Sequence, residues 1–263
     1  MEKEKGEDPT FHDIPLEEVV VRPALATPEP AAEPDLLYKS LMGKAIQTII
    51  RLASLPPSRW KLYNTTPHRT RIGALFELED DTAPTFCSLK ATAVIQGRAE
   101  RYAHILSDHD PIVRMPWDSA NFSLVRHCET FRAPEGDIDV VQARLNIGGF
   151  FLQGIQSRDY DPDLKTHKYY FCTATNPRHA PPPGAGPIVD LLYGVFVRQL
   201  DGEQCEVTIV TNAKVEGRFA MLPEVFVRGY KELVLDRIFV LEGVVREWGK
   251  YYGKERDPKK KRW

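Results

Sequence analysis

The fold is decided by the stretch LPEVFVRGYKELVLDRIFVLEGVVREWGKY, residues 222–251. Pro223 suits the first turn of a helix and the next proline is Pro258, so the stretch predicts a helix about 40 Å long. At about 100° per residue its apolar side chains fall on one side of the helix, over an arc of roughly 160°. They are Leu222, Phe226, Tyr230, Leu233, Val234, Ile238, Leu241, Val244, Val245, Trp248 and Tyr251. So broad a stripe indicates a helix that faces the space enclosed by a curled sheet.

The chain before this helix has the pattern of β-strands joined by turns. Runs of β-forming residues, separated by proline, glycine and aspartate, predict strands at residues 60–65, 71–79, 86–95, 122–131, 138–147, 169–176, 188–200 and 205–213. Apolar residues at helical spacing predict one helix between Asp35 and Pro56 and a short helix over residues 99–106. The sequence therefore predicts an α+β domain with long antiparallel strands.

Composition separates a central domain from two tails. Residues 1–34 are acidic and rich in proline, which predicts a disordered leader, and residues 253–263 form a basic tail. One domain is expected between them, over residues 35–252. The formal net charge of -2 provides no chain-wide basic field, so we expect no nucleic-acid partner. With no long apolar run and no apolar core in the N-terminal MEKEKGEDP, the sequence predicts a cytoplasmic protein.

The sequence lacks the usual signatures of metal and catalytic sites. Its cysteines, Cys87, Cys128, Cys172 and Cys205, lie far apart and form no CxxC pair, which argues against a zinc site and against a disulfide scaffold. HExxH, the P-loop, GxGxxG and GxSxG are all missing from the sequence. We therefore expect no metal, no cofactor and no enzymatic activity.

Several local motifs appear in a characteristic order along the chain. Trp117-Asp118 follows the short helix, and Ser157-Arg158-Asp159-Tyr160 and a proline-rich stretch at 177–187 come later. Val215-Glu216-Gly217 then precedes Leu222-Pro223 at the start of the long helix. With the order of elements, these motifs resemble the START (steroidogenic-acute-regulatory-related lipid-transfer) domains of the Bet v 1-like superfamily, over about residues 35–250. The resemblance implies a helix-grip fold: a curved antiparallel sheet of about nine strands around the C-terminal helix, with an internal hydrophobic cavity.

The same resemblance implies binding and intermembrane transfer of one lipid, a sterol, phospholipid or sphingolipid. The family often has an arginine where this chain has Ile188-Val189-Asp190, and a basic residue where it has Asp161 to Leu164, so the head-group contacts of relatives are not carried over. Alternation does not reveal which strand positions point inward, for example Arg126 or His127. The candidate lipid-binding residues are Arg237, Tyr230, Leu233, Val234, Leu241, Phe226, Tyr193, Phe196, Arg126 and Arg144.

Arg237 falls near the centre of the apolar stripe, one turn from Leu233 and Leu241. An unpaired guanidinium would carry a large desolvation cost there, so a partner is required. One hypothesis is an ion pair with an inward-facing carboxylate such as Asp190 or Glu129. The other is contact with a phosphate or another anionic lipid head, whose oxygens suit the fork of arginine.

Candidate gate and membrane contacts come from a loop, the helix and the tail. Gly148-Gly149-Phe150-Phe151-Leu152 combines flexible glycines with an apolar tip, which suits a gating loop but equally suits a β-bulge with buried phenylalanines. The basic tail ending in Trp263 suits an anionic membrane surface, or is simply solvated. The candidate gate and membrane residues are Phe150, Phe151, Leu152, Phe239, Lys260 and Arg262.

Two other classes of function remain open at this point. One is a helix-grip enzyme acting on a hydrophobic small molecule, which would need ionisable groups with perturbed pKa values converging in the cavity. The other is an interaction module with a filled core that works through its tails. The leading prediction is a monomeric lipid carrier that contacts membranes transiently.

Overall fold

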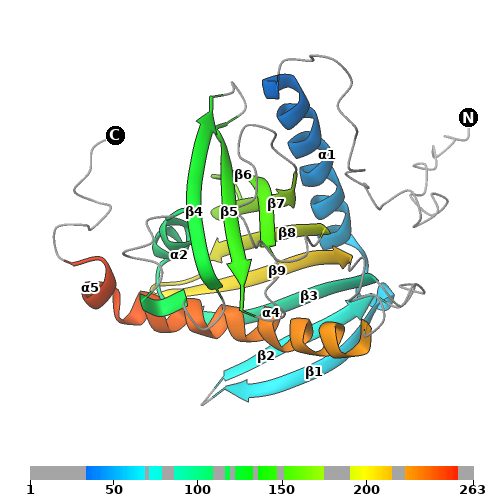
Figure 1. The fold of residues 1–263 in the computed structure, drawn as a ribbon. Helices are drawn as coiled ribbons and strands as arrows, with labels where there is room; N and C mark the ends of the chain where they lie inside the picture. The colour runs from blue at the N-terminus through cyan, green and yellow to red at the C-terminus, as the bar shows by residue number, and fades with distance from the viewer. Residues whose placement is uncertain are drawn as a thin grey trace, which may run out of the picture.

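A single antiparallel sheet forms the framework of the protein (Figure 1). The structure, a computed structural model, describes residues 34–68, 71–78, 86–108, 116–118, 122–132, 136–146, 151–174, 190–214 and 223–253. Over these residues the sheet has nine strands in the order β1-β2-β3-β9-β8-β7-β6-β5-β4. Their bounds are β1 Trp60–His68, β2 Arg71–Leu78, β3 Phe86–Gln96, β4 Phe122–Phe131, β5 Ile138–Leu145, β6 Phe151–Asp161, β7 Thr166–Thr173, β8 Asp190–Gln199 and β9 Gln204–Lys214. The predicted α+β class and sheet size are confirmed.

The order of the strands follows the chain except where β3 pairs with β9. This pairing joins the meander β1–β3 to the meander β4–β9, and its ladder runs without a register shift from Phe86 opposite Lys214 to Gln96 opposite Gln204. In Figure 1, β4 and β5 run across the direction of β8 and β9, so the sheet is strongly curved. The long helix α4 (Pro223–Arg246) lies within the curve.

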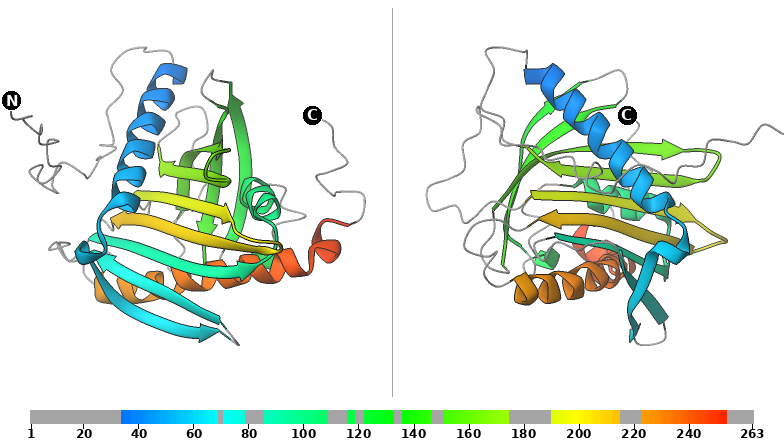
Figure 2. Two further views of the ribbon diagram at one scale, coloured as in Figure 1. Left: turned by 180° about the vertical axis from the view of Figure 1, so that it is seen from behind. Right: turned by 90° about the vertical axis from the view of Figure 1, so that its right-hand side faces the viewer.

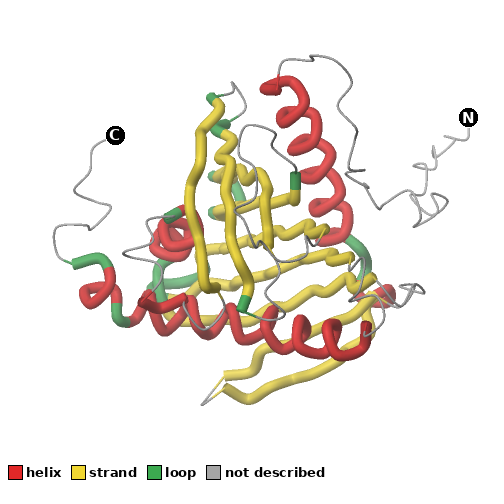
Figure 3. The backbone as a smooth tube through the Cα atoms, viewed as in Figure 1, coloured by secondary structure: helices red, strands yellow, loops and turns green. Residues whose placement is uncertain are grey.

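Helices cover both faces of the sheet, as the tube view also makes clear (Figures 2 and 3). Helix α1 (Pro34–Ser54) packs on one face, and a 3-10 turn, η2 (Pro57–Arg59), leads from it to β1. Helices α2 (Ala99–Ser107) and α4 pack on the other face. The two faces are called here the α1 side and the α4 side.

The predicted apolar stripe of α4 is buried against the sheet. Along the helix and the short α5 (Trp248–Tyr251) that follows it, the stripe residues with the lowest exposure belong to one cluster with β3, β8 and β9. They are Tyr230, Val234, Ile238, Leu241, Val244, Val245 and Trp248. Each such side chain contributes about 2 kcal/mol through removal of its surface from water. The stripe is therefore a main source of the stability of the fold.

The C-terminal end of α4 is held by the turn between β3 and α2. The backbone N–H of Gln96 donates to Glu242 Oε1 at 2.9 Å, and the Tyr102 hydroxyl donates to the Gln96 carbonyl at 2.8 Å. Gly97 has φ +128°, and a Cβ added there would overlap Val245 Cγ1. Glycine is therefore required here both for its backbone conformation and for the close approach of α4.

Two elements differ from the prediction. Strand β6 was not found from its pattern, because Phe151 to Ser157 are buried without interruption and show no polar alternation. Both of its faces are covered, which removes the period-two signal.

The C-terminal helix, expected to be unbroken to residue 250, is divided at Glu247, where the backbone leaves the helical region. In the turn that follows, Trp248 stacks on Tyr252 with ring centroids 4.2 Å apart.

Gly97→Ala should lower the free energy of unfolding by about 2 kcal/mol, because alanine is strained at this φ and its methyl group collides with Val245. Urea titration measures the change. The matched control is Gly243→Ala on α4, where no atom lies within 4 Å of an added Cβ. That variant should gain between about 0.5 and 1 kcal/mol from helix propensity. Equal stability of the two variants would contradict the close contact at Gly97.

Candidate functional site

The alternation of side chains along β5 and β8 decides which residues can face α4. Val141 belongs to the α4-side cluster, whereas Val140 packs with α1. In β8, Val195 and Val197 lie on the α4 side and Leu192 on the α1 side. Because successive strand residues point to opposite faces, these positions fix the direction of the others.

The predicted binding residues on α4 lie on the face that meets the sheet. Tyr230, Val234 and Leu241 are buried, and Leu233 is half-buried against the same cluster. Tyr193 of β8 also packs against this cluster from the sheet. The side chain of Phe226 lies outside the described residues. The structure thus brings together five of the predicted apolar and aromatic positions.

Three of the predicted strand residues point the other way. Phe196 packs in the α1-side clusters, and its ring meets that of Tyr170 edge-on, with ring centroids 6.0 Å apart. Arg126 lies opposite Gln142 and donates to Gln142 Oε1 at 2.7 Å, and Gln142 and Arg144 share the face of Val140. The expectation that Phe196, Arg126 and Arg144 face the inside of the curved sheet is wrong. The register of β4, β5 and β8 turns the neighbouring residues of these strands towards the inside instead.

The predicted gate residues that the structure describes are buried. Phe151 and Leu152 belong to β6 rather than to an exposed loop tip, and Phe151 is 0% exposed. Phe239, expected to be off the stripe, is 7% exposed and belongs to the α4-side cluster. Of the two alternatives for Phe151 and Leu152, burial is the one found, and Phe239, a candidate membrane contact, is instead packed in the interior. Phe150, Lys260 and Arg262 lie outside the described residues.

Arg237 is held by a buried carboxylate. Its two terminal nitrogens both donate to Asp118, Nη1 to Oδ1 and Nη2 to Oδ2, the latter at 3.0 Å. Arg237 is 8% exposed and Asp118 is 0% exposed. The expected ion pair therefore exists, but with Asp118 rather than Asp190 or Glu129. The side chains of those two residues point to the α1 side of the sheet, whereas Arg237 lies on the α4 side.

Aromatic rings surround this ion pair. The guanidinium of Arg237 lies over the ring of Trp117, 5.3 Å from its centroid, and the phenols of Tyr193 and Tyr169 are close enough to act on its charge. Burial by itself would lower the pKa of Arg237, but the charge and hydrogen bonds of Asp118 raise it above the ordinary value. Arg237 thus keeps its charge inside the protein, opposite the carboxylate of Asp118.

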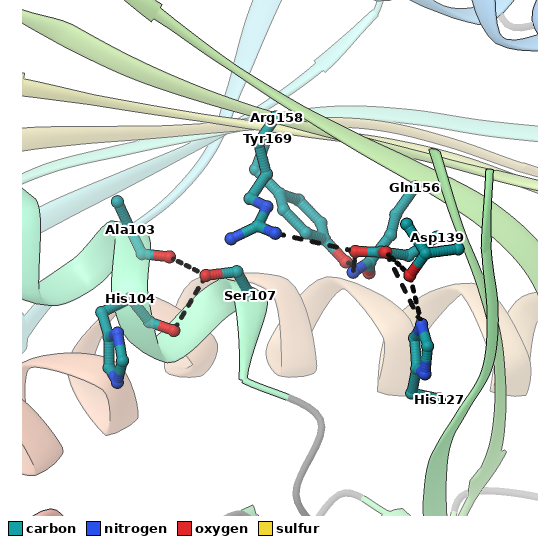
Figure 4. A network of polar contacts seen from close by, with 9 residues as sticks. Ala103, His104, Ser107, His127, Asp139, Gln156, Arg158 and Tyr169 are labelled. Atoms are coloured by element: carbon teal, nitrogen blue, oxygen red, sulfur yellow. Dashed lines mark hydrogen bonds and ion pairs between the residues drawn. The ribbon is translucent and has the colours of Figure 1, made fainter. Parts of the chain in front are cut away.

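A second polar group lies on the α4 side, where β4, β5, β6 and β7 meet (Figure 4). We call it the Asp139 network, and it consists of His127, Thr130, Asp139, Gln156, Arg158 and Tyr169. Asp139 is 7% exposed, and it lies opposite Thr130 on one side and Gln156 on the other. The register of three strand pairs therefore assembles this network.

Hydrogen bonds in the network converge on the Asp139 carboxylate. The Thr130 hydroxyl donates to Oδ1 at 2.7 Å, and Gln156 Nε2 donates to Oδ2 at 3.2 Å. The Tyr169 hydroxyl donates in turn to Gln156 Oε1. His127 and Arg158 lie farther away, at 3.6 and 3.8 Å from the carboxylate oxygens. Tyr169 meets Tyr193 edge-on, so the network continues towards Arg237.

These partners keep Asp139 ionised. Burial by itself would raise its pKa, but the hydrogen bonds from Thr130 and Gln156, together with the charges of Arg158 and His127, lower it below the ordinary value. A carboxylate with a lowered pKa is a weak base. The network is therefore better suited to holding a fixed pattern of hydrogen bonds than to removing a proton from a substrate.

Other reactive groups on this part of the chain are poorly placed for chemistry. Burial raises the pKa of the Cys172 and Cys205 thiols to about 12, so both are protonated. Ser107, also drawn in Figure 4, hydrogen-bonds the carbonyl oxygens of Ala103 and His104 in its own helix. Over the described residues no cluster of His, Cys, Asp and Glu could hold a metal ion. In the same part of the chain, no helix has the length and apolar character needed to span a membrane.

Sequence reasoning missed the most polar part of the site. Asp118 was recognised as part of a motif but not as the partner of Arg237, and Asp139, Gln156 and Tyr169 were not singled out. Asp139 interrupts the apolar run Ile138 to Val141, which was a usable signal for a buried carboxylate. Its partners come from two other strands, β4 and β6, and a sequence pattern does not show their register.

Comparison with known proteins identifies the fold through structure rather than sequence. No protein-family model matches the chain, and no curated protein matches its sequence. Human StAR-related lipid transfer protein 5 superposes with a TM-score of 0.65 at 12% identity, covering 81% of this chain and 99% of its own. Human STARD10 gives 0.60 at 15% identity, covering 90% and 94%. The lipid transfer and protein localization domain of human StarD13 gives 0.57 at 10% identity, covering 78% and 96%. The chain thus has the START helix-grip fold that the sequence motifs predicted.

The Arg237–Asp118 pair should show strong thermodynamic coupling. Arg237→Met leaves a buried carboxylate and should lower the free energy of unfolding by about 3 kcal/mol, and Asp118→Leu should have a similar effect. The double variant Arg237→Met/Asp118→Leu removes both charges and should lose much less than the sum of the two. A double-mutant cycle by urea titration measures the coupling. Simple additivity would show that the two side chains do not interact in solution.

The stability contributed by Asp139 should depend on pH. Because its pKa is lower in the folded state, this contribution is present above the ordinary aspartate value of about 3.9 and is lost as the pH falls through the folded value. Asp139→Asn should therefore cost about 1 to 2 kcal/mol at pH 7 and progressively less below about pH 4. Thermal unfolding from pH 7 to pH 3 measures the difference. The matched control Asp137→Asn, at an exposed neighbouring position, should follow the wild type at every pH.

Proposed function

We propose that the protein binds one lipid between α4 and the curved sheet and carries it between membranes. The observation that carries this proposal is the combination of a broad apolar surface on α4 with a small number of polar side chains on the same side of the sheet. Ligand sites typically have apolar walls with a few fixed polar groups that orient the ligand. The Asp139 network and the Arg237–Asp118 pair have that character.

Apolar side chains dominate the α4 side of the central strands. They come from alternate positions on β3, β8 and β9 and include Ala91, Ala93, Val195, Val197, Val207 and Ile209. Leu233, Tyr169 and Tyr193 pack against this cluster and retain some exposure. An acyl chain or a sterol ring system sheltered by such walls gains about 25 cal/mol per Å² of apolar surface removed from water. We propose an internal cavity in this region as the binding site.

The names of the structural relatives support the transfer step. One is a StAR-related lipid transfer protein and another a lipid transfer and protein localization domain. On this analogy, α4 and an adjacent loop at Gly148-Gly149 form the gate, and Phe150, Lys260 and Arg262 contact the membrane. The protein then acts as a monomer that meets membranes transiently from the cytoplasm. The weak basicity of Asp139 and the protonated state of Cys172 support a carrier over an enzyme.

Leu233→Glu should abolish lipid transfer without unfolding the protein, because it places a carboxylate on the half-buried part of the stripe. The assay measures movement of a fluorescent lipid from donor to acceptor liposomes, and circular dichroism checks the fold. We expect at least a tenfold lower rate. The control Arg246→Glu makes a larger charge change on the exposed side of the same helix and should keep the wild-type rate within about twofold. Wild-type protein that neither retains lipid in native mass spectrometry nor transfers it would overturn the proposed function.

A further inference from the structure

We infer that the polar group of the bound lipid is uncharged, a hydroxyl or carbonyl rather than a phosphate or sulfate. This inference rests on the proposed function and assigns a ligand class to the same site. It follows from how charged side chains on the α4 side are already paired, and from the neutral character of the hydrogen-bonding groups that lie between them.

Arg237 is the cation best placed to bind an anionic lipid head, but its guanidinium group already binds a carboxylate. Both terminal nitrogens bind Asp118, which is fully buried. A phosphate that took the place of Asp118 would leave a buried carboxylate without its cation. A phosphate that shared the guanidinium with Asp118 would bring two like charges together in a medium of low dielectric constant. Either arrangement opposes an anionic head at this position.

Three other described cations on the α4 side, Arg158, His127 and Lys231, also have acidic partners. Arg158 and His127 both lie within 4 Å of Asp139, whose oxygens are fixed by further hydrogen bonds. Lys231, near the start of α4, binds Glu77 at 2.8 Å and lies 4.1 Å from the centre of the Tyr63 ring. Arg237, Arg158 and Lys231 are thus each matched by one carboxylate, that of Asp118, Asp139 and Glu77 respectively. Among the described residues, these ion pairs therefore leave no excess positive charge between α4 and the sheet with which to stabilise an anion.

The other hydrogen-bonding groups close to these ion pairs are neutral. The phenols of Tyr169 and Tyr193 and the amide of Gln156 lie between the two ion pairs, and the Tyr230 hydroxyl meets Thr211 at 2.5 Å on the same side of the sheet. Phenol and amide groups can each donate and accept. A ligand hydroxyl or carbonyl can enter such a chain by exchanging one hydrogen bond for another. No charge is left without its partner in that exchange.

Matched pairs of lipids test the inference on the wild-type protein. Diacylglycerol and phosphatidic acid share their acyl chains and differ by the phosphate, and cholesterol and cholesterol sulfate differ by the sulfate. Binding of each lipid from neutral carrier liposomes is measured by co-elution and mass spectrometry. We expect at least a tenfold preference for the uncharged member of whichever pair binds. Equal or tighter binding of the anionic member overturns the inference and leaves the proposed function standing, whereas no binding of any lipid overturns both.

Asp118→Asn tests the cause of the preference, because it removes the charge that neutralises Arg237. This variant should bind phosphatidic acid or cholesterol sulfate at least tenfold more tightly than the wild type does. Asp201→Asn, at an exposed turn position, is the matched control and should leave the preference unchanged.

The charge-free double variant Arg237→Met/Asp118→Leu covers the case in which Asp118→Asn does not fold. It should keep the neutral lipid and continue to reject the anionic one. If the wild type binds an anionic lipid and the double variant does not, Arg237 holds the charged head, contrary to the inference.

Discussion

The structure depends on one constraint: a single sheet has two faces, and each must be covered by a helix that fits it. On one face, α1 packs through Tyr38, Met42 and Ile49. On the other, α4 packs closest to β3 and β2, and its stripe belongs to one apolar cluster with residues of β3, β8 and β9. The β3–β9 ladder makes this arrangement possible, because it joins two meanders into one surface broad enough to curve around α4.

The buried ion pair between Arg237 and Asp118 adds specificity to this packing. Apolar contacts are non-directional and would tolerate small shifts of α4 along its axis, whereas a bidentate pair has one geometry. Desolvation offsets much of the attraction within such a pair, so its main consequence is positional. It ties the middle of α4 to residues 116–118, while Gln96 and Gly97 hold the end of the same helix. The polar groups on the sheet therefore face a fixed part of α4.

Much of this architecture could be predicted from local patterns. The spacing of Leu37, Leu41 and Ala45 predicted α1, and the stripe from Tyr230 to Trp248 predicted the buried side of α4. Strand β6 could not be found in this way, because burial on both faces removes alternation. The face of the sheet to which Phe196 and Arg144 point could not be predicted either, because a strand considered alone has two equivalent faces until its neighbours are in place.

The sequence by itself determined the kinds of element, their order and the need for Arg237 to have a buried partner, since periodicity and desolvation act through near neighbours or single side chains. Tertiary structure alone decided that the partner is Asp118 and that Asp139 collects hydrogen bonds from Thr130 and Gln156. These contacts join residues far apart in the chain, and the strand register that aligns them is a cooperative result of packing both faces of the sheet. The charge balance of the candidate site is therefore a property of the folded chain.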